Sequence, residues 1–123
     1  MKNLKNNLPY FILAGIIISV SFVLCVLSVM GDSITIDESA HIPAGYSYLT
    51  QKDMRMNPEH PPMIKDISAI PLLFQDINFD TNHPSWKNDV NGQWAAGTHF
   101  LYESGNDPDK IVFSARRAML FVF

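Results

Sequence analysis

The sequence has few of the features that would stabilise a small secreted scaffold or attract nucleic acid. Its 123 residues contain one cysteine, Cys25, which can form no disulfide with another residue of this sequence. Nine basic and twelve acidic residues give a formal net charge of −3, without a basic cluster. No repeat or low-complexity tract is present. These absences argue against a disulfide framework and against nucleic acid as a partner.

Charge is also absent from a long apolar stretch near the start, residues 8–30, which predicts a first transmembrane helix. A helix needs about 20 residues to cross the hydrocarbon core, whereas a secretory signal has a core of about 7–15. Lys2 and Lys5 precede the stretch with no acid nearby. The positive-inside rule then places residues 1–7 in the cytoplasm and residues 31–109 on the outer side of a plasma membrane.

The extracytoplasmic loop is expected to hold short helices. The first covers residues 37–51, with Asp37 as its N-cap, and a proline-rich extended turn follows over residues 53–62. The next helix begins at Pro61 and Pro62, since proline suits a first turn. Its apolar side chains form a stripe that could lie in the membrane interface: Met63, Ile64, Ile67, Ile70 and Phe74.

The rest of the loop is expected to be turn-rich over residues 76–91 and helical over residues 93–102. Asp107 and Pro108 predict the N-cap and first residue of a last helix. This helix, residues 110–123, becomes wholly apolar from Ala118 as the sequence stops, which predicts the start of a second transmembrane helix that is cut short. The expected fold class is therefore an all-α membrane protein, here a fragment of a multi-span bundle.

Two acids, Asp37 and Glu38, follow the first apolar stretch closely. Carboxylates at a membrane surface lie where a lipid-linked substrate presents its head group, although Asp37 could simply cap a helix. Asp37 could also help to hold Mg or Mn, since these ions prefer carboxylate ligands. Glu38 and His41 have the Glu-x-x-His spacing of di-iron bundles, but such sites need two copies and this sequence has one. A di-iron site is therefore not expected.

Further candidates are His60, whose backbone is fixed by Pro61 and Pro62, and the pair Arg116 and Arg117. His41 by itself is better explained as a packing or hydrogen-bonding histidine. The arginines are either interfacial anchors or a clamp for phosphate, which guanidinium groups bind through two parallel hydrogen bonds.

Together these motifs resemble the protein O-mannosyltransferase and aminoarabinose-transferase group of C-type membrane glycosyltransferases. The matching stretches are Asp37-Glu-Ser-Ala-His41, Tyr46-Ser-Tyr48, Asn57-Pro-Glu-His-Pro-Pro-Met-Ile-Lys65 and Ser114-Ala-Arg116. In mannosyltransferases the third stretch commonly contains His-Pro-Pro-Leu-Gly-Lys, so this sequence departs from it at Met63 and Ile64.

The resemblance implies sugar transfer from a polyprenyl-phosphate donor to a hydroxyl of a protein, lipid or glycan, with inversion at the sugar carbon. It assigns Asp37 the role of general base or metal ligand, and Glu38 a supporting or acceptor-binding role. Arg116 and Lys65 would offset the charge of the leaving phosphate, and His60 would position the sugar or a loop. Residues 1–123 alone are expected to be inactive.

Two other hypotheses remain at this point. The chain could be a non-catalytic two-span membrane protein whose outer loop binds a partner, with Asp37 as a cap and the arginines as anchors. It could also be a membrane-anchored metal protein that depends on His41 and His60.

Overall fold

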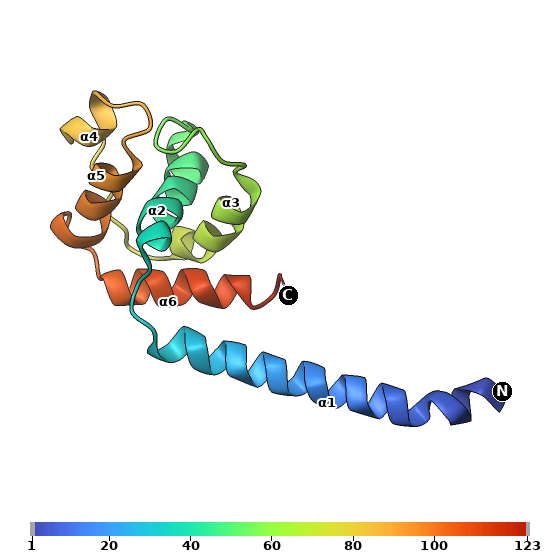
Figure 1. Cartoon of the computed structure of the whole chain (residues 1–123). Coiled ribbons are helices and arrows are strands. Elements are labelled where there is room, and N and C mark those ends of the chain that lie inside the picture. Colours follow the sequence, from blue (N-terminus) through green and yellow to red (C-terminus); the bar gives the residue numbers. More distant parts are fainter. Residues whose placement is uncertain (1, 123) are drawn as a thin grey trace. The chain divides into compact units, whose positions relative to one another are not determined.

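The computed structural model describes residues 2–122, with side chains from residue 7 onward, and this part of the chain is helical without a strand. It divides into two compact units, residues 2–32 and residues 33–122. Figure 1 shows the elements. In order they are α1 (Lys2–Gly31), α2 (Ile36–Gln51), α3 (Met63–Ala69), η1 (Ile70–Phe74), α4 (Pro84–Lys87), α5 (Gln93–Thr98), η2 (His99–Glu103) and α6 (Pro108–Met119).

The first unit is the single helix α1, and its segment Asn7–Gly31 is long and apolar enough to cross a membrane. Its large apolar side chains are exposed, which is unfavourable in water and favourable in hydrocarbon. The predicted apolar helix at residues 8–30 is thus confirmed as a helix. No other helix within residues 2–122 meets the same criterion. The orientation of α1 and the second span remain predictions, and α6 ends at Met119.

The second unit is built around α2, whose residues from Ile42 to Tyr48 are all buried. The predicted N-cap was wrong by two positions. Thr35 caps α2, because its hydroxyl accepts from the Glu38 amide while the Glu38 carboxylate accepts from the Thr35 amide. This reciprocal capping box satisfies two backbone donors, and it places Asp37 inside the first turn.

Two glycines allow helices to pack closely against α2. A Cβ at Gly45 would overlap the carbonyl oxygen of Lys65 in α3, and a Cβ at Gly97 in α5 would overlap that of Ser39. No larger residue fits at either position, so both contacts depend on a bare backbone.

The helix α3 follows Pro62, as predicted, and continues into the 3₁₀ turn η1. Its buried side carries Lys65, Ser68 and Ala69, while the predicted apolar stripe is largely exposed. Phe74, at the end of the stripe, is 86% exposed. The amphipathic pattern is therefore present, and its apolar side faces outward from the second unit.

The remaining elements close the core over α2. Asp107 caps α6 and Pro108 is its first residue, as predicted. The helix expected over residues 93–102 is α5 followed by the π-helical turn η2, and the turn-rich region also contains the short helix α4, capped by His83. The largest core cluster contains Ile42, Tyr46, Ala69, Leu72, Phe100, Leu101, Ile111, Val112 and Ala115.

Candidate functional site

One cavity of about 410 Å³ in the second unit is bordered by all five predicted site residues. It lies among the first turns of α2, the turn that precedes α3, and α6. Its polar lining consists of Asp37, Glu38, His41, His60, Lys65, Ser68 and Arg116, and its apolar lining of Ile42, Pro61, Ile64 and Ala115. Residues that are far apart in the sequence therefore meet at one place, and each has a different environment there.

Asp37 is the carboxylate at this cavity that the fold does not use. Its side chain is exposed and makes no hydrogen bond or ion pair with the residues that the structure describes. It belongs to the first turn of α2, where the unpaired backbone amides of the helix favour a negative charge. The carboxylate is thus positioned to accept a proton or to bind a cation.

His41 lies one turn further along α2 and is held by Asn57, a fully buried residue. The Asn57 amide donates to Nδ1 of His41 over 3.1 Å and also to the side-chain oxygen of Gln93. Since Nδ1 accepts this hydrogen bond, the hydrogen-bond network assigns the neutral tautomer with a proton on Nε2.

The environment of His41 favours this neutral form. Burial lowers its pKa, and the nearby Lys65 and His60 lower it further, while Asp37 acts in the opposite direction. The rings of His41 and His60 meet edge to face with centroids 5.5 Å apart. His41 therefore offers an N–H donor at the cavity.

Lys65, predicted to offset the charge of a leaving phosphate, has its ammonium bound within the fold. Only 4% of the residue is exposed, and its ammonium donates to Tyr48 Oη at 3.1 Å and to the carbonyl oxygens of Asn57 and His60 at 3.0 Å each. An ammonium has three protons, so these contacts use all of them. Burial lowers the pKa of Lys65. The residue holds the turn over residues 57–60 in place, with no donor left for a phosphate.

Glu38 and Arg116 are bound to each other. The Nε of Arg116 donates to Oε1 of Glu38 at 2.6 Å and Nη2 donates to Oε2 at 2.7 Å, while Nη2 also donates to the Ser33 carbonyl at 2.8 Å. Burial acts to raise the pKa of Glu38, but the bonds from Arg116 and Thr35 and the guanidinium charge hold it below its usual value. Glu38 is thus an ionised structural residue and a poor general base.

A metal at Asp37 would depend on ligands from outside the described residues. Among the described residues, the group of three or more His, Cys, Asp or Glu ligands close enough for one ion is elsewhere, at His83, His99 and Glu103. Mg and Mn are often held by one or two carboxylates together with water and substrate phosphates. Asp37 fits that arrangement, whereas the metal hypothesis based on His41 and His60 lacks a third protein ligand.

Sequence reasoning underestimated His41 and missed Asn57 and Gln93. Asn57 begins the stretch that resembles the glycosyltransferase motif, so the motif itself was the available signal. No sequence signal indicated the role of Gln93, because its contact with Asn57 joins residues 36 positions apart.

Comparison of the chain with models of known protein families, with curated proteins and with solved structures found no match.

Proposed function

We propose that this chain contributes the acceptor-activating part of an integral membrane glycosyltransferase. The enzyme moves a sugar from a polyprenyl-phosphate donor to an acceptor hydroxyl on a protein, lipid or glycan, at the outer face of the plasma membrane. One observation carries the proposal. The four stretches that resemble this enzyme group include every polar residue at the cavity except Ser68.

In the proposed reaction Asp37 is the general base. The acceptor oxygen attacks the anomeric carbon as the bond from that carbon to the phosphate oxygen breaks, and the phosphate leaves with the electron pair. The hydroxyl proton passes to the Asp37 carboxylate. Because attack and departure occur on opposite faces of the sugar carbon, its configuration inverts. The Nε2–H of His41 donates a hydrogen bond to the sugar or to the acceptor.

Arg116 is the proposed cation facing the leaving phosphate, since arginine matches phosphate geometry. Glu38 orients its guanidinium and offsets part of its charge. A divalent cation, Mg or Mn, held jointly by Asp37 and the donor phosphate is the alternative role for that carboxylate. His60 is proposed to contact the sugar at the rim of the cavity.

The exposed apolar surface of α3 and η1 supports a site next to lipid. Residues 32–35 form the short linker between α1 and α2. Ile64 belongs both to the exposed stripe and to the cavity lining, which suits a donor whose polyprenyl chain stays in the bilayer.

The test is transfer of labelled sugar from a synthetic polyprenyl-phosphate sugar in membranes of cells that express the native gene. Asp37→Asn keeps the shape of the side chain and removes the base, and we expect transfer to fall by about 100-fold or more. Asp109→Asn, an exposed acid in the first turn of α6, is the matched control and should retain activity.

Wild-type transfer by Asp37→Asn would refute the assigned role. Membranes with no transfer from any polyprenyl-phosphate sugar would favour the non-catalytic partner-binding protein. Dependence of the rate on added Mg or Mn after chelation distinguishes a metal-bound Asp37 from a general base.

A further inference from the structure

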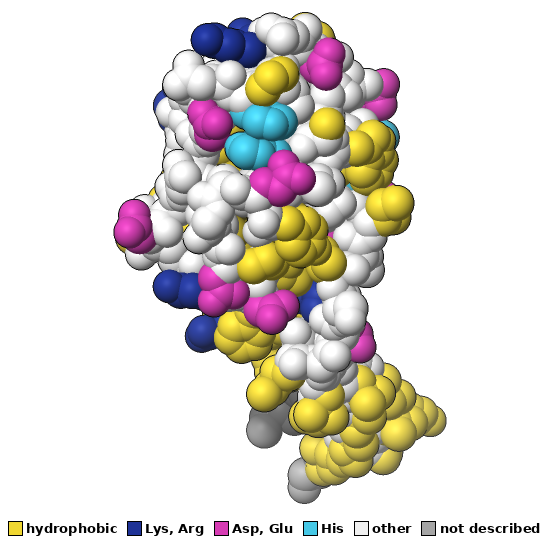
Figure 2. Space-filling model, turned by 90° about the vertical axis from the view of Figure 1, so that its left-hand side faces the viewer, with side chains coloured by type: hydrophobic (Ala, Val, Ile, Leu, Met, Phe, Trp, Pro, Cys, Tyr) yellow, Lys and Arg dark blue, Asp and Glu magenta, His cyan; other side chains and the backbone are white. Residues whose placement is uncertain are grey.

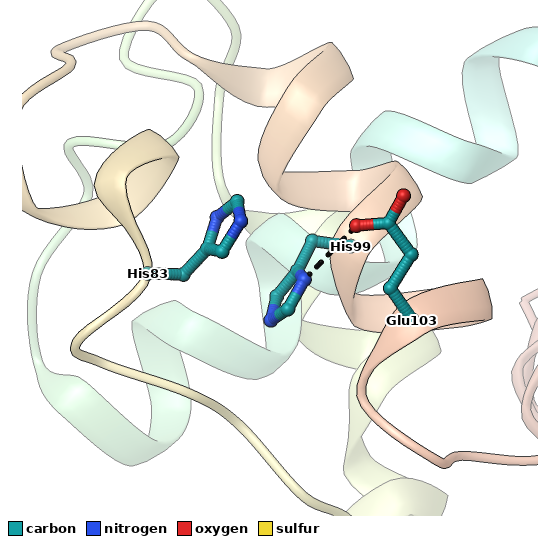
Figure 3. A group of neighbouring side chains, drawn as sticks. All are labelled: His83, His99 and Glu103. Atoms are coloured by element: carbon teal, nitrogen blue, oxygen red, sulfur yellow. Dashed lines mark hydrogen bonds and ion pairs between the residues drawn. The ribbon is translucent and has the colours of Figure 1, made fainter.

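We propose a second site, for a divalent transition metal of the zinc class, formed by His83, His99 and Glu103. It is separate from the cavity at Asp37 and does not rest on the glycosyltransferase proposal. Figure 2 shows histidine side chains next to acidic ones at the surface, on the side of the second unit where α4 and α5 lie. Figure 3 shows the three residues, which come from the N-cap of α4 and from the π-helical turn η2.

The spacing of the three side chains suits one ion. One ligand atom from each lies within 4.8 Å of the other two, and His99 Nδ1 is 3.1 Å from Glu103 Oε2. Two ligands that each lie about 2.0–2.1 Å from a tetrahedral zinc are about 3.3 Å apart. The His99–Glu103 pair is therefore already near the separation that coordination requires.

His83 has a hydrogen-bond partner on the nitrogen that would not bind the metal, whereas on His99 a carboxylate lies near that nitrogen without a hydrogen bond. His83 Nδ1 lies 2.7 Å from the Ser85 hydroxyl and, as the N-cap of α4, accepts from the Ser85 amide at 3.4 Å. Metal binding through Nε2 therefore requires His83 to change tautomer, so that Nδ1 donates to the hydroxyl and gives up the cap. On His99, Nε2 is 3.7 Å from the Asp80 carboxylate, which leaves Nδ1 as the ligand beside Glu103. Metal-binding histidines typically donate their second N–H to a hydroxyl, carbonyl or carboxylate in this way.

The Nε2 atom of His99, on the far side of the ring from Glu103, lacks a hydrogen bond. Its Nε2 is buried and has no hydrogen-bond partner among the described residues, since 3.7 Å is too long for a hydrogen bond. A metal on Nδ1 would fix the tautomer with a proton on Nε2, and a small movement would bring that proton to Asp80. The buried nitrogen would then be satisfied.

One rearrangement is required on binding. The two imidazole rings are stacked, with centroids 3.7 Å apart and planes 8° from parallel, so their lone pairs do not converge. His83 lies at the end of the loop ahead of α4, and turning its ring toward Glu103 would break the stack with His99 and the contacts of Nδ1 with Ser85. The stacked arrangement holds the two imidazole rings close to each other, and metal coordination would replace this ring stacking.

Two imidazoles and one carboxylate favour Zn(II), with Co(II) as a spectroscopic substitute in the same ligands. Three protein ligands leave a fourth position for water. Bound metal would connect the loop before α4 to η2, so it would raise the unfolding temperature of the folded chain by preferential binding to the native state.

The experiment uses the full chain in detergent, purified without a histidine tag and treated with chelator. We expect Co(II) to give the visible absorption of a four-coordinate ion at one equivalent, Zn(II) to displace it, and Zn(II) to raise the unfolding temperature. His83→Ala and Glu103→Gln should each weaken Co(II) binding by about tenfold or more, and Asp80→Asn by about tenfold. His60→Ala, a histidine outside this group, should bind as the wild type does.

Absence of Co(II) absorption and of a Zn(II)-dependent temperature shift in the wild type would overturn the proposal. Equal binding by the wild type and by His83→Ala would also overturn it, because the metal would then lie elsewhere. Circular dichroism of each variant shows that it has folded. A variant that fails to fold is replaced by His99→Gln or His83→Gln, for which the same loss of binding is expected.

Discussion

Glu38 and Arg116, 78 residues apart in sequence, form a bidentate ion pair that joins the first turn of α2 to the last turn of α6. The Glu38 carboxylate also accepts from the Thr35 amide at 2.8 Å, so one side chain caps α2 and binds α6. Of the two neighbouring acids, Glu38 is used by the fold and Asp37 faces the cavity. Their adjacent positions in the sequence do not distinguish these two roles.

Glu38→Gln should lower the free energy of unfolding by about 1–2 kcal/mol. Glutamine can still cap the helix, but it leaves the partly buried Arg116 guanidinium without its counter-charge. Chemical unfolding of the full chain in detergent, followed by fluorescence of the buried Trp86, measures the change. Arg117→Gln is the matched control and should change stability by about 0.5 kcal/mol or less. Equal effects of the two changes would contradict a special role for the pair.

Lys65→Met should destabilise the protein by about 2–4 kcal/mol even with no substrate present. The change leaves Tyr48 Oη and the His60 carbonyl oxygen without the Lys65 donor, and the Asn57 carbonyl oxygen with the Tyr48 hydroxyl alone. Lys110→Met, at an exposed position of α6, is the control. Thermal unfolding provides the readout. If Lys65→Met kept wild-type stability and lost only donor binding, the phosphate role predicted from the sequence would be correct.

Gly45→Ala and Gly97→Ala should each cost about 3 kcal/mol or prevent folding. In both cases the new methyl group meets a backbone carbonyl that cannot move without separating the helices. Gly15→Ala in α1 has no atom of the chain within 4 Å of the added carbon and should leave the second unit unchanged. Protease resistance of the second unit compares the three variants. Stable folding of Gly45→Ala would show that α2 and α3 are less closely packed than described.

Stability should fall as the pH drops below about 6.5, through His41. Its pKa in the folded protein is below the usual value, so the unfolded chain takes up the proton first and is stabilised relative to the folded state. The loss is complete once the pH is below the folded-state pKa. His41→Gln should reduce this dependence. The pKa of Glu38 is also lowered, but its contribution begins to be lost only below about pH 4.5. An unchanged pH profile in His41→Gln would refute the assignment.

A nitroxide at position 74 should lie in the lipid interface. In a Cys25→Ser background, Phe74→Cys carries the label on the exposed stripe and Asn82→Cys carries it on an exposed polar loop. In liposomes the label at position 74 should collide more with oxygen and less with a water-soluble nickel complex than the label at position 82. Equal collision rates would show that the stripe faces water or protein.

Much of the local structure could be predicted because it depends on neighbouring residues. The apolar stretch before Gly31, the proline-rich turn before α3 and the Asp107–Pro108 start of α6 follow from periodicity, length and capping. The N-cap of α2 was also readable from sequence, since Thr35 and Glu38 have capping-box spacing. It was missed because Asp37 offered a simpler cap.

The sequence by itself determined which residue types border the cavity, because short motifs of Asp, His, Pro and Arg are visible without coordinates. Only the tertiary structure decided what each does. Lys65 is buried and supports the turn before α3. Glu38 is bound by Arg116, 78 residues away, and so has a structural role. The hydrogen bond from Asn57 determines the tautomer of His41. Those roles depend on long-range contacts and on exclusion of water. Neither can be inferred from residues that are neighbours in the sequence.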